Sequence, residues 1–261
     1  MPFRQVGPIR FFEFESLGHT DLIQAIFTRQ GGLSPAPWAS LNVGGTVGDD
    51  NSRVESNIER CFEAVGRATE TVHDVWQSHS AVVVVADSPR QGSVRVRADI
   101  LVSDQPGVTL FMRFADCVPI FLFDPKARAV GLVHAGWLGT VRKAVEAAVK
   151  AMNEKFGSRP QDIQAGVGPS IGSDHYPVGP EVVEQVRRAF GAAADRHLHR
   201  QNGTTCFDLW SANQTLLEGV GVRSIEVSGI CTACHLEDWY SHRGERGHTG
   251  RFGALVALAD R

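Results

Sequence analysis

A cysteine and two histidines hold positions from which they could act together. Cys117 opens an apolar run, and His134 closes the next one, with a turn around Asp124 between them. If these runs are neighbouring antiparallel strands, the first residue of one lies beside the last residue of the other. His79 lies just before a further apolar run. The three side chains are therefore candidates for a common site.

A thiolate and two imidazoles suit Zn²⁺, whose catalytic sites combine three protein ligands with one position open to water or substrate. The ion would lower the pKa of a bound water towards neutrality. Gly136 and Gly139, which follow His134, would let the backbone approach a small ligand closely. We interpret His79, Cys117 and His134 as an open metal site.

Two other interpretations of these residues stay open. A histidine at a strand end and a lone cysteine are usually structural residues, and the chain has no compact ligand motif such as HExxH. Alternatively, Cys117 is a nucleophile, with His134 as its base and Asp116 as the group that orients the base. Because adjacent strand residues point to opposite faces, Asp116 is poorly placed for that role.

The segment CTACH contains Cys231, Cys234 and His235. It matches the CxxCH pattern of c-type haem attachment, and its first four residues match CxxC redox sites. We recognise no export signal for the first, and no βαβ pattern around the segment for the second. A loop with buried thiols is the expectation, and the role of the segment is left open.

Cationic and polar side chains gather in loop-like segments. One region contains Arg29, Ser40 and Asn42, and another contains Arg243 and Arg251. A glycine-rich segment, GVGPSIGSDHYPVG, adds backbone amides that could face an anion. Each segment alone reads as a solvated loop. Together they predict a site for an anionic substrate or phosphate.

The spacing of apolar residues along the chain predicts the helices and strands that must position these side chains. Apolar stripes predict helices over 52–66 and 140–157, the second capped by Thr140 and ended by Gly157, and two shorter helices over 181–190 and 209–217. Strands are predicted in LIQAIFT, AVVVVA, DILVS, GVTLFMRF, CVPIFLF, AVGLVH, IQAGVG, SIEVSGI and GALVAL. Because these strands often follow one another directly, we expect an α+β fold with mixed or antiparallel pairing.

Composition narrows the class of protein. The chain has 261 residues, 43% of them apolar and 21% charged, which suits an ordinary globular protein. A net charge of −3 and scattered basic residues do not indicate a nucleic-acid surface, and no apolar run is long enough to cross a membrane. Glu13 and Glu15 interrupt any signal peptide, and five cysteines do not form a disulfide framework, so we expect a cytoplasmic protein.

Eleven short segments occur in a telling order: FTRQGGLS, ASLNVG, GDD, QSHS, ADCVPI, HAGWLGTV, GPSIGSDHYPVG, FDLW, CT, YSHR and TGR. This order resembles the laccase-domain family, long labelled multicopper polyphenol oxidases and similar to purine nucleoside phosphorylases. The resemblance extends from about Phe27 to Val256, and ADCVP with HAGW is highly specific.

The resemblance implies one domain over 1–261, with mixed β-sheets packed in layers and helices outside (α/β/β/α-like), and 1–20 as a peripheral extension. It implies Zn²⁺, with copper as the alternative, bound by His79, Cys117 and His134. It further implies phosphorolysis of adenosine, inosine, guanosine and methylthioadenosine, with purine nucleoside and phosphate as partners, and an added adenosine deaminase activity that uses a metal-activated water. The substrate or phosphate contacts would come from Arg29, Ser40, Asn42, Arg243 and Arg251, with no protein acid or base assigned.

The chain departs from the family pattern in three places. The usual HAGWRGT has Leu138 here, so phosphate binding would be weaker or would use Arg142 or Arg243. Ser80 stands where glycine is common, and HYPVG replaces Cys-Tyr-Glu-Val-Gly, which places His175 at the cysteine. Two alternatives to the phosphorylase function therefore remain open: a copper-dependent polyphenol oxidase, and a metal-binding protein with weakened turnover. The oligomeric state is not predicted.

Overall fold

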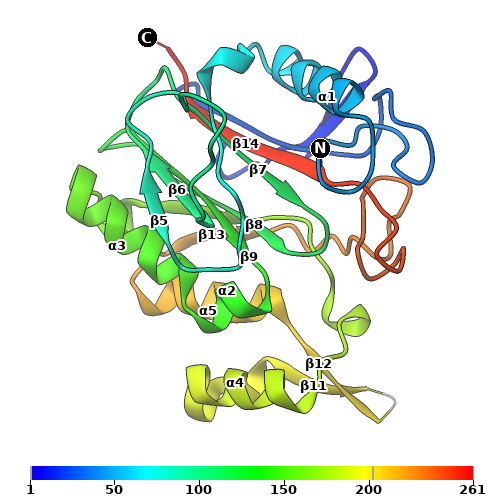
Figure 1. Cartoon of the computed structure of the whole chain (residues 1–261). Coiled ribbons are helices and arrows are strands. Elements are labelled where there is room, and N and C mark those ends of the chain that lie inside the picture. The colour runs from blue at the N-terminus through cyan, green and yellow to red at the C-terminus, as the bar shows by residue number, and fades with distance from the viewer. Residues whose placement is uncertain (1, 202, 261) are drawn as a thin grey trace.

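Two six-stranded sheets lie face to face in the computed structural model, which describes residues 2–201 and 203–260 (Figure 1). The first sheet runs in the order β1 (Phe3–Val6), β2 (Ile9–Phe12), β3 (Leu22–Phe27), β14 (Phe252–Leu258), β7 (Thr109–Phe114) and β4 (Val72–His73). The second runs β13 (Ser224–Val227), β10 (Gln164–Val167), β8 (Val118–Asp124), β9 (Ala129–Ala135), β6 (Ile100–Ser103) and β5 (Val83–Val85). A two-stranded sheet, β11 (Leu198–Gln201) with β12 (Thr204–Phe207), stands apart.

Helices cover the outer face of each sheet (Figure 1). Helix α1 (Asn51–Ala64) packs Cys61 and Phe62 against the first sheet. The second sheet is covered by α3 (Ala144–Phe156) and α5 (Leu209–Gly219), with α2 (Trp137–Val141) and α4 (Pro180–Phe190) beside them. In the described part of the chain, no helix has the length and apolar character needed to cross a membrane.

Strands β8 and β9 are buried on both faces, and their alternation sorts side chains between two cores. In β8, Ile120 and Leu122 pack towards the helices, whereas Phe121 and Phe123 pack between the sheets. In β9, Val130 and Leu132 also lie between the sheets. Successive strand residues point to opposite faces, so His134 shares the face of Leu132 and enters the space between the sheets.

The fold class expected from the sequence is confirmed. Both large sheets mix parallel and antiparallel pairs, and each of the nine predicted runs contains a strand. All four predicted helices form, and Asp50 caps α1 by accepting hydrogen bonds from the backbone of Ser52 and Arg53. Five short strands were not predicted: β1, β2, β4, β11 and β12. Each has four residues or fewer, and β1 and β11 are largely exposed, so their apolar pattern is too short to indicate a strand.

The predicted helix over 140–157 is wrong at its start. The structure divides it into α2 and α3, and Lys143 separates them with a left-handed backbone (φ 60°, ψ 43°). Thr140 lies inside α2 and donates its hydroxyl to the Gly136 carbonyl at 2.9 Å, so it does not cap α3. Gly157 ends α3 in the left-handed conformation, as expected.

The segment expected as a peripheral extension reaches the core. Strands β1 and β2 form the edge of the first sheet, and β1 is largely exposed. Phe12, Phe14 and Leu17, however, are fully buried between the two sheets. From β2 onwards this segment is therefore part of the layered core.

A buried carboxylate joins three arginines at the end of the first sheet. Asp74, which is 2% exposed, accepts hydrogen bonds from Arg90 (2.6 Å), Arg95 (2.7 Å) and Arg113 (2.9 Å). Burial would raise the pKa of Asp74, but attraction to Arg113 and Arg95 outweighs it and holds the pKa below its usual value. The cluster fastens the loop between β5 and β6 to β7.

We predict that Asp74→Asn lowers the free energy of unfolding by about 2 kcal/mol, because it removes the buried carboxylate that pairs with three partly buried guanidinium groups. The folded-state pKa of Asp74 is depressed, so its stabilisation is present above the unfolded-state pKa and is lost below about pH 4. Urea unfolding between pH 7 and pH 3 should therefore show a smaller acid loss in the variant than in the wild type. Glu184→Gln, which breaks an exposed pair with Arg188, is the control and should change stability by less than about 0.5 kcal/mol.

Candidate metal centre

The β8–β9 hairpin brings Cys117 and His134 together. The register pairs Pro119 with His134 in an antiparallel ladder, and Cys117 lies just before β8 at the same end. The loop before β5 adds His79, whose Nε2 lies 3.9 Å from the Cys117 Sγ. One ligand atom from each of the three residues lies within 4.8 Å of the other two. The structure thus places the three predicted metal ligands in one cluster.

The backbone around this cluster is unusual. His79 and Asp116 have φ angles of 58° and 82°, in the left-handed region that side chains other than glycine rarely adopt. At Gly136, a Cβ would lie 2.7 Å from the Cys117 Sγ and 3.4 Å from a His79 ring carbon. Glycine at the exit of β9 is therefore required because the cysteine and histidine occupy the space of a side chain.

Asp99 orients two of the three candidate ligands. Its Oδ1 accepts a hydrogen bond from the His134 Nδ1 at 2.8 Å, which leaves the other ring nitrogen, Nε2, for the cluster. Its Oδ2 accepts from the backbone and the hydroxyl of Ser80, at 2.6 and 2.8 Å, and so holds the loop that carries His79. A carboxylate behind a ligating imidazole is the usual support for a metal-binding histidine.

The charges of this group are strongly coupled. Burial would raise the pKa of the Asp99 carboxyl, but hydrogen bonds from His134 and Ser80 outweigh it and hold the pKa far below its usual range. Burial would also raise the pKa of Cys117, yet attraction to His134 and hydrogen bonds from both histidines lower it to about 6. Conversely, the pKa of His134 is raised to about 9, since the charges of Cys117 and Asp99 overcome its burial.

The donor set fits a tetrahedral soft-metal ion. With Zn–S near 2.3 Å and Zn–N near 2.0 Å, such an ion holds its sulfur and nitrogen ligands about 3.5 Å apart. The 3.9 Å between Cys117 Sγ and His79 Nε2 approaches this separation, and side-chain rotation of the exposed His79 closes the difference. Cys117 and His134 are less exposed, so the ion would sit at the mouth of the space between the sheets.

In the alternative with a cysteine nucleophile, the structure changes which carboxylate could orient the base. The Asp116 carboxylate accepts from Thr232 and Ser241, each at 2.7 Å. Asp116 and Cys117 lie before β8, and Asp116 has a left-handed backbone, so its direction is set by this turn and not by strand alternation. The orienting carboxylate is Asp99 instead, so Cys117, His134 and Asp99 have the order of a nucleophile, base and orienter. A second imidazole on the same sulfur has no part in that mechanism, and His79 therefore favours the metal interpretation.

Two of the predicted substrate contacts lie near the cluster. The Arg243 backbone donates to Asp116 at 2.6 Å, and its guanidinium lies over the Tyr176 ring, 5.2 Å from the centroid. The negative charges of Cys117 and Asp116 act on Arg251, whose pKa is lowered by burial. The guanidinium groups also donate to backbone carbonyls, of Pro177 at 3.1 Å and of Gly250 at 2.8 Å. Two cationic side chains thus lie near the cluster.

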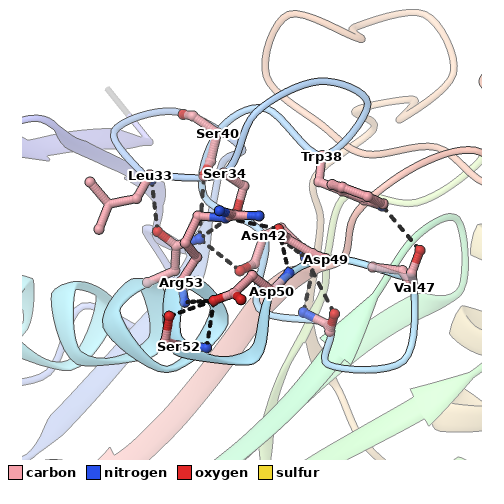
Figure 2. Close-up of polar contacts among 12 residues, drawn as sticks. Leu33, Ser34, Trp38, Ser40, Asn42, Val47, Asp49, Asp50, Ser52 and Arg53 are labelled. Carbon is pink, nitrogen blue, oxygen red and sulfur yellow. Dashed lines mark hydrogen bonds and ion pairs between the residues drawn. The ribbon is translucent and has the colours of Figure 1, made fainter.

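Arg29, Ser40 and Asn42 instead have their polar groups engaged within the protein. Asn42 is fully buried and donates to Asp49 at 3.0 Å (Figure 2). It also accepts from the Arg251 backbone at 2.8 Å. Ser40 donates its hydroxyl to the Arg29 carbonyl, and the Arg29 guanidinium pairs with Glu245 at 3.0 Å. This network supports the segment that carries Arg251.

The position that departs from the family pattern lies beside the cluster. Leu138 is the second residue of α2, directly after the turn at Gly136. Arg142, one of the cations expected to replace the usual arginine, donates to the His79 carbonyl at 2.9 Å. Arg142 therefore also helps to hold the His79 loop.

Sequence reasoning missed Asp99 and Tyr176. The signal for Asp99 was its place directly before the run ILVS, but only the pairing of β6 with β9 shows that it faces His134. A cavity of about 390 Å³ lies elsewhere, against Asp74 and Arg90, and contains none of the candidate residues. The candidate site is thus defined by its side chains.

Comparison with known proteins gives extensive matches. The family described as multi-copper polyphenol oxidoreductase laccase matches residues 23–259. A protein of Deinococcus radiodurans named purine nucleoside phosphorylase is 39% identical, over 91% of this chain and 89% of its own length. Purine nucleoside phosphorylase YlmD of Bacillus subtilis is 34% identical, over 92% of this chain and 90% of its own.

Solved structures match equally well. YlmD from Geobacillus stearothermophilus superposes with a TM-score of 0.92 at 31% identity, covering 99% of both chains. A Bacillus licheniformis structure described as hypothetical protein YfiH gives 0.91 at 30% identity, covering 98% of this chain and 99% of its own. The layered mixed sheets are therefore shared with both structures.

We predict that Asp99→Asn weakens zinc binding by about 10- to 100-fold, because the supporting carboxylate charge behind His134 is lost. Competition with a chromophoric chelator measures the affinity, and circular dichroism checks that the variant is folded. Asp87→Asn, an exposed carboxylate between β5 and β6, serves as the control and should leave the affinity unchanged. Unaltered zinc affinity in a folded Asp99→Asn protein would contradict the role given to Asp99.

In metal-free protein, Cys117 should react with iodoacetamide with a midpoint near pH 6, since the thiolate is the reactive form and its pKa is lowered to about 6. Cys234 is the internal control, because burial and the neighbouring Cys231 raise its pKa to about 11. Mass spectrometry of alkylated peptides resolves the two. His134→Ala should move the Cys117 midpoint upwards, and a wild-type midpoint above pH 8 would refute the proposed ion pair.

Proposed function

This chain belongs to the family of multi-copper polyphenol oxidoreductase laccases, and we propose that within it the chain is a zinc-dependent purine nucleoside phosphorylase. The family match over residues 23–259 and the relative of 39% identity confirm the family membership expected from the sequence. The observation that carries the proposed activity is the cluster of His79, Cys117 and His134, which Asp99 supports. The chain also matches relatives named purine nucleoside phosphorylase along nearly their whole length.

Phosphorolysis makes two demands on the site. Phosphate replaces the purine at the anomeric carbon of ribose, and the glycosidic electron pair leaves with the base, which must then gain a proton or a hydrogen bond. The site must therefore hold an anion on one side of the sugar and stabilise the leaving purine on the other. An ion held by His79, Cys117 and His134 would supply Lewis acidity to this reaction.

The side chains around the cluster meet these demands in the proposal. Arg243 and Arg251 supply positive charge for phosphate on the side of Asp116. Burial and the charge of Cys117 raise the pKa of Tyr176 well above its usual value, so its hydroxyl stays protonated and can donate to the substrate. Asp99 keeps His134 in the tautomer whose Nε2 faces the cluster, and so fixes the orientation of the imidazole throughout the reaction.

The proposal also covers the substrates and the cellular location of the enzyme. We assign adenosine, inosine, guanosine and methylthioadenosine as substrates, with adenosine deamination as an additional reaction at the same cluster. The enzyme is placed in the cytoplasm, where free thiols such as the five cysteines here persist.

Copper-dependent phenol oxidation is the second candidate, because it is the activity that the family's description names. Laccase chemistry uses several copper ions, whereas the described residues form two groups with metal-binding donors, of three side chains each. One thiolate with two imidazoles also suits zinc. Metal analysis together with a phenol-oxidation assay separates the two candidates.

The test is chromatography of zinc-loaded protein with adenosine, inosine or methylthioadenosine, each with and without phosphate. We expect free purine base only when phosphate is present, and a loss on the order of 100-fold or more in His79→Ala and in Cys117→Ala. His199→Ala, an exposed histidine on β11, is the matched control and should retain full activity.

Each other outcome has a defined meaning. Inosine formed from adenosine without phosphate would establish the deaminase reaction. Weak phosphorolysis that Leu138→Arg strengthens would identify a chain whose phosphate site is impaired by Leu138. No product from any nucleoside, in folded protein shown to hold zinc, would overturn the phosphorylase proposal and leave the metal centre in place.

A further inference from the structure

A second group of soft metal ligands lies outside the site described above. His175 belongs to the short 3-10 turn Ser173–His175, and Cys231 and Cys234 belong to the loop after β13. The His175 Nδ1 lies 3.8 Å from the Cys231 Sγ and 3.6 Å from the Cys234 Sγ. One ligand atom from each lies within 4.8 Å of the others. None of these residues has a role in the proposed phosphorolysis.

The two segments are fixed to each other next to the cluster. Ser170 forms a parallel bridge with Cys231: its amide donates to the Ile230 carbonyl, and its carbonyl accepts from the Thr232 amide. The Gly172 backbone also donates to the Cys231 Sγ at 3.2 Å. Backbone contacts therefore hold the segments of the sulfur and the imidazole together.

The distances match those of a coordinated ion better than those of a chance contact. A tetrahedral zinc ion holds sulfur and nitrogen ligands about 3.5 Å apart, and cysteines separated by two residues are a common ligand pair. Both His175–sulfur distances, 3.6 and 3.8 Å, lie near that value. A Cys231–Cys234 disulfide would leave neither sulfur free to bind an ion, so the state of the two cysteines distinguishes this alternative from a metal site.

We propose that His175, Cys231 and Cys234 bind a second Zn²⁺ ion. Asp174 carries a carboxylate oxygen 3.0 Å from the same His175 nitrogen but is not one of the donors that all lie within 4.8 Å of one another, so the fourth position is left to a water molecule. His235, the last residue of the CTACH segment, is not a ligand: its ring contacts Glu237 at 3.1 Å.

The second ion would brace the loops around the first cluster. Thr232, next to Cys231, donates to the Asp116 carboxylate at 2.7 Å, and the Ile171 backbone donates to the Asp116 carbonyl at 3.0 Å. Asp116 directly precedes Cys117. The ion therefore ties together the two loops that hold Asp116, and its role is structural and not a part of the chemistry.

The test is zinc content per chain, measured on reduced full-length protein after zinc loading and gel filtration. We expect two ions in the wild type and one in Cys117→Ser/His79→Ala, where only the second cluster remains. His175→Ala and Cys234→Ser should each retain one ion; both side chains are exposed, so these variants should fold. His235→Ala is the matched control and should retain both ions.

Cobalt substitution supplies a readout that separates the two clusters. Co²⁺ bound in Cys117→Ser/His79→Ala should show thiolate-to-cobalt charge transfer from two sulfurs, and this absorption should be lost in the same background with Cys234→Ser, which no longer holds the second ion. One zinc ion in the wild type, lost in Cys117→Ser/His79→Ala, would overturn the proposal. So would a Cys231–Cys234 disulfide that persists in the zinc-loaded protein, or zinc content unaffected by His175→Ala. None of these results depends on enzymatic activity.

Discussion

The hydrogen bonds of Asp99 are the interaction on which the candidate metal centre depends. One carboxylate oxygen orients His134 at the end of β9, and the other holds Ser80 and hence the loop of His79. The two imidazoles also contact each other, with ring centroids 5.1 Å apart, and Arg142 donates to the His79 carbonyl. Asp99 is the carboxylate that acts on both of their segments. The same negative charge favours a cationic centre at the edge of the sheet.

The layered core explains why this centre lies where it does. Strands β8 and β9 are buried on both faces, so polar side chains are accommodated only where the strands begin or end. Cys117 and His134 occupy such ends on the side that faces the other sheet. The loop between β10 and α4 brings Tyr176 to the same edge, and the loop between β13 and β14 brings Thr232 and Arg243. The rigid layers thus position a site that is completed by loops.

Much of this arrangement could be predicted from the sequence, because it follows from local pattern. Two consecutive apolar runs joined by a tight turn predict a hairpin, and a hairpin places Cys117 beside His134. Asp99 could not be predicted, since its position depends on β6 pairing with β9, and no local pattern encodes that choice. The grouping of His175 with Cys231 and Cys234 likewise depends on contacts between segments far apart in the sequence.

The positions of the three candidate ligands in the sequence also suggest an order in which they come together during folding. Cys117 and His134 belong to one hairpin, and such local contacts generally form with a small loss of chain entropy. His79 joins them only after β6 has added to β9 and Asp99 has captured the Ser80 loop. A newly made chain would therefore present a two-ligand half-site first, and the full affinity for an ion would arise only with the completed sheet.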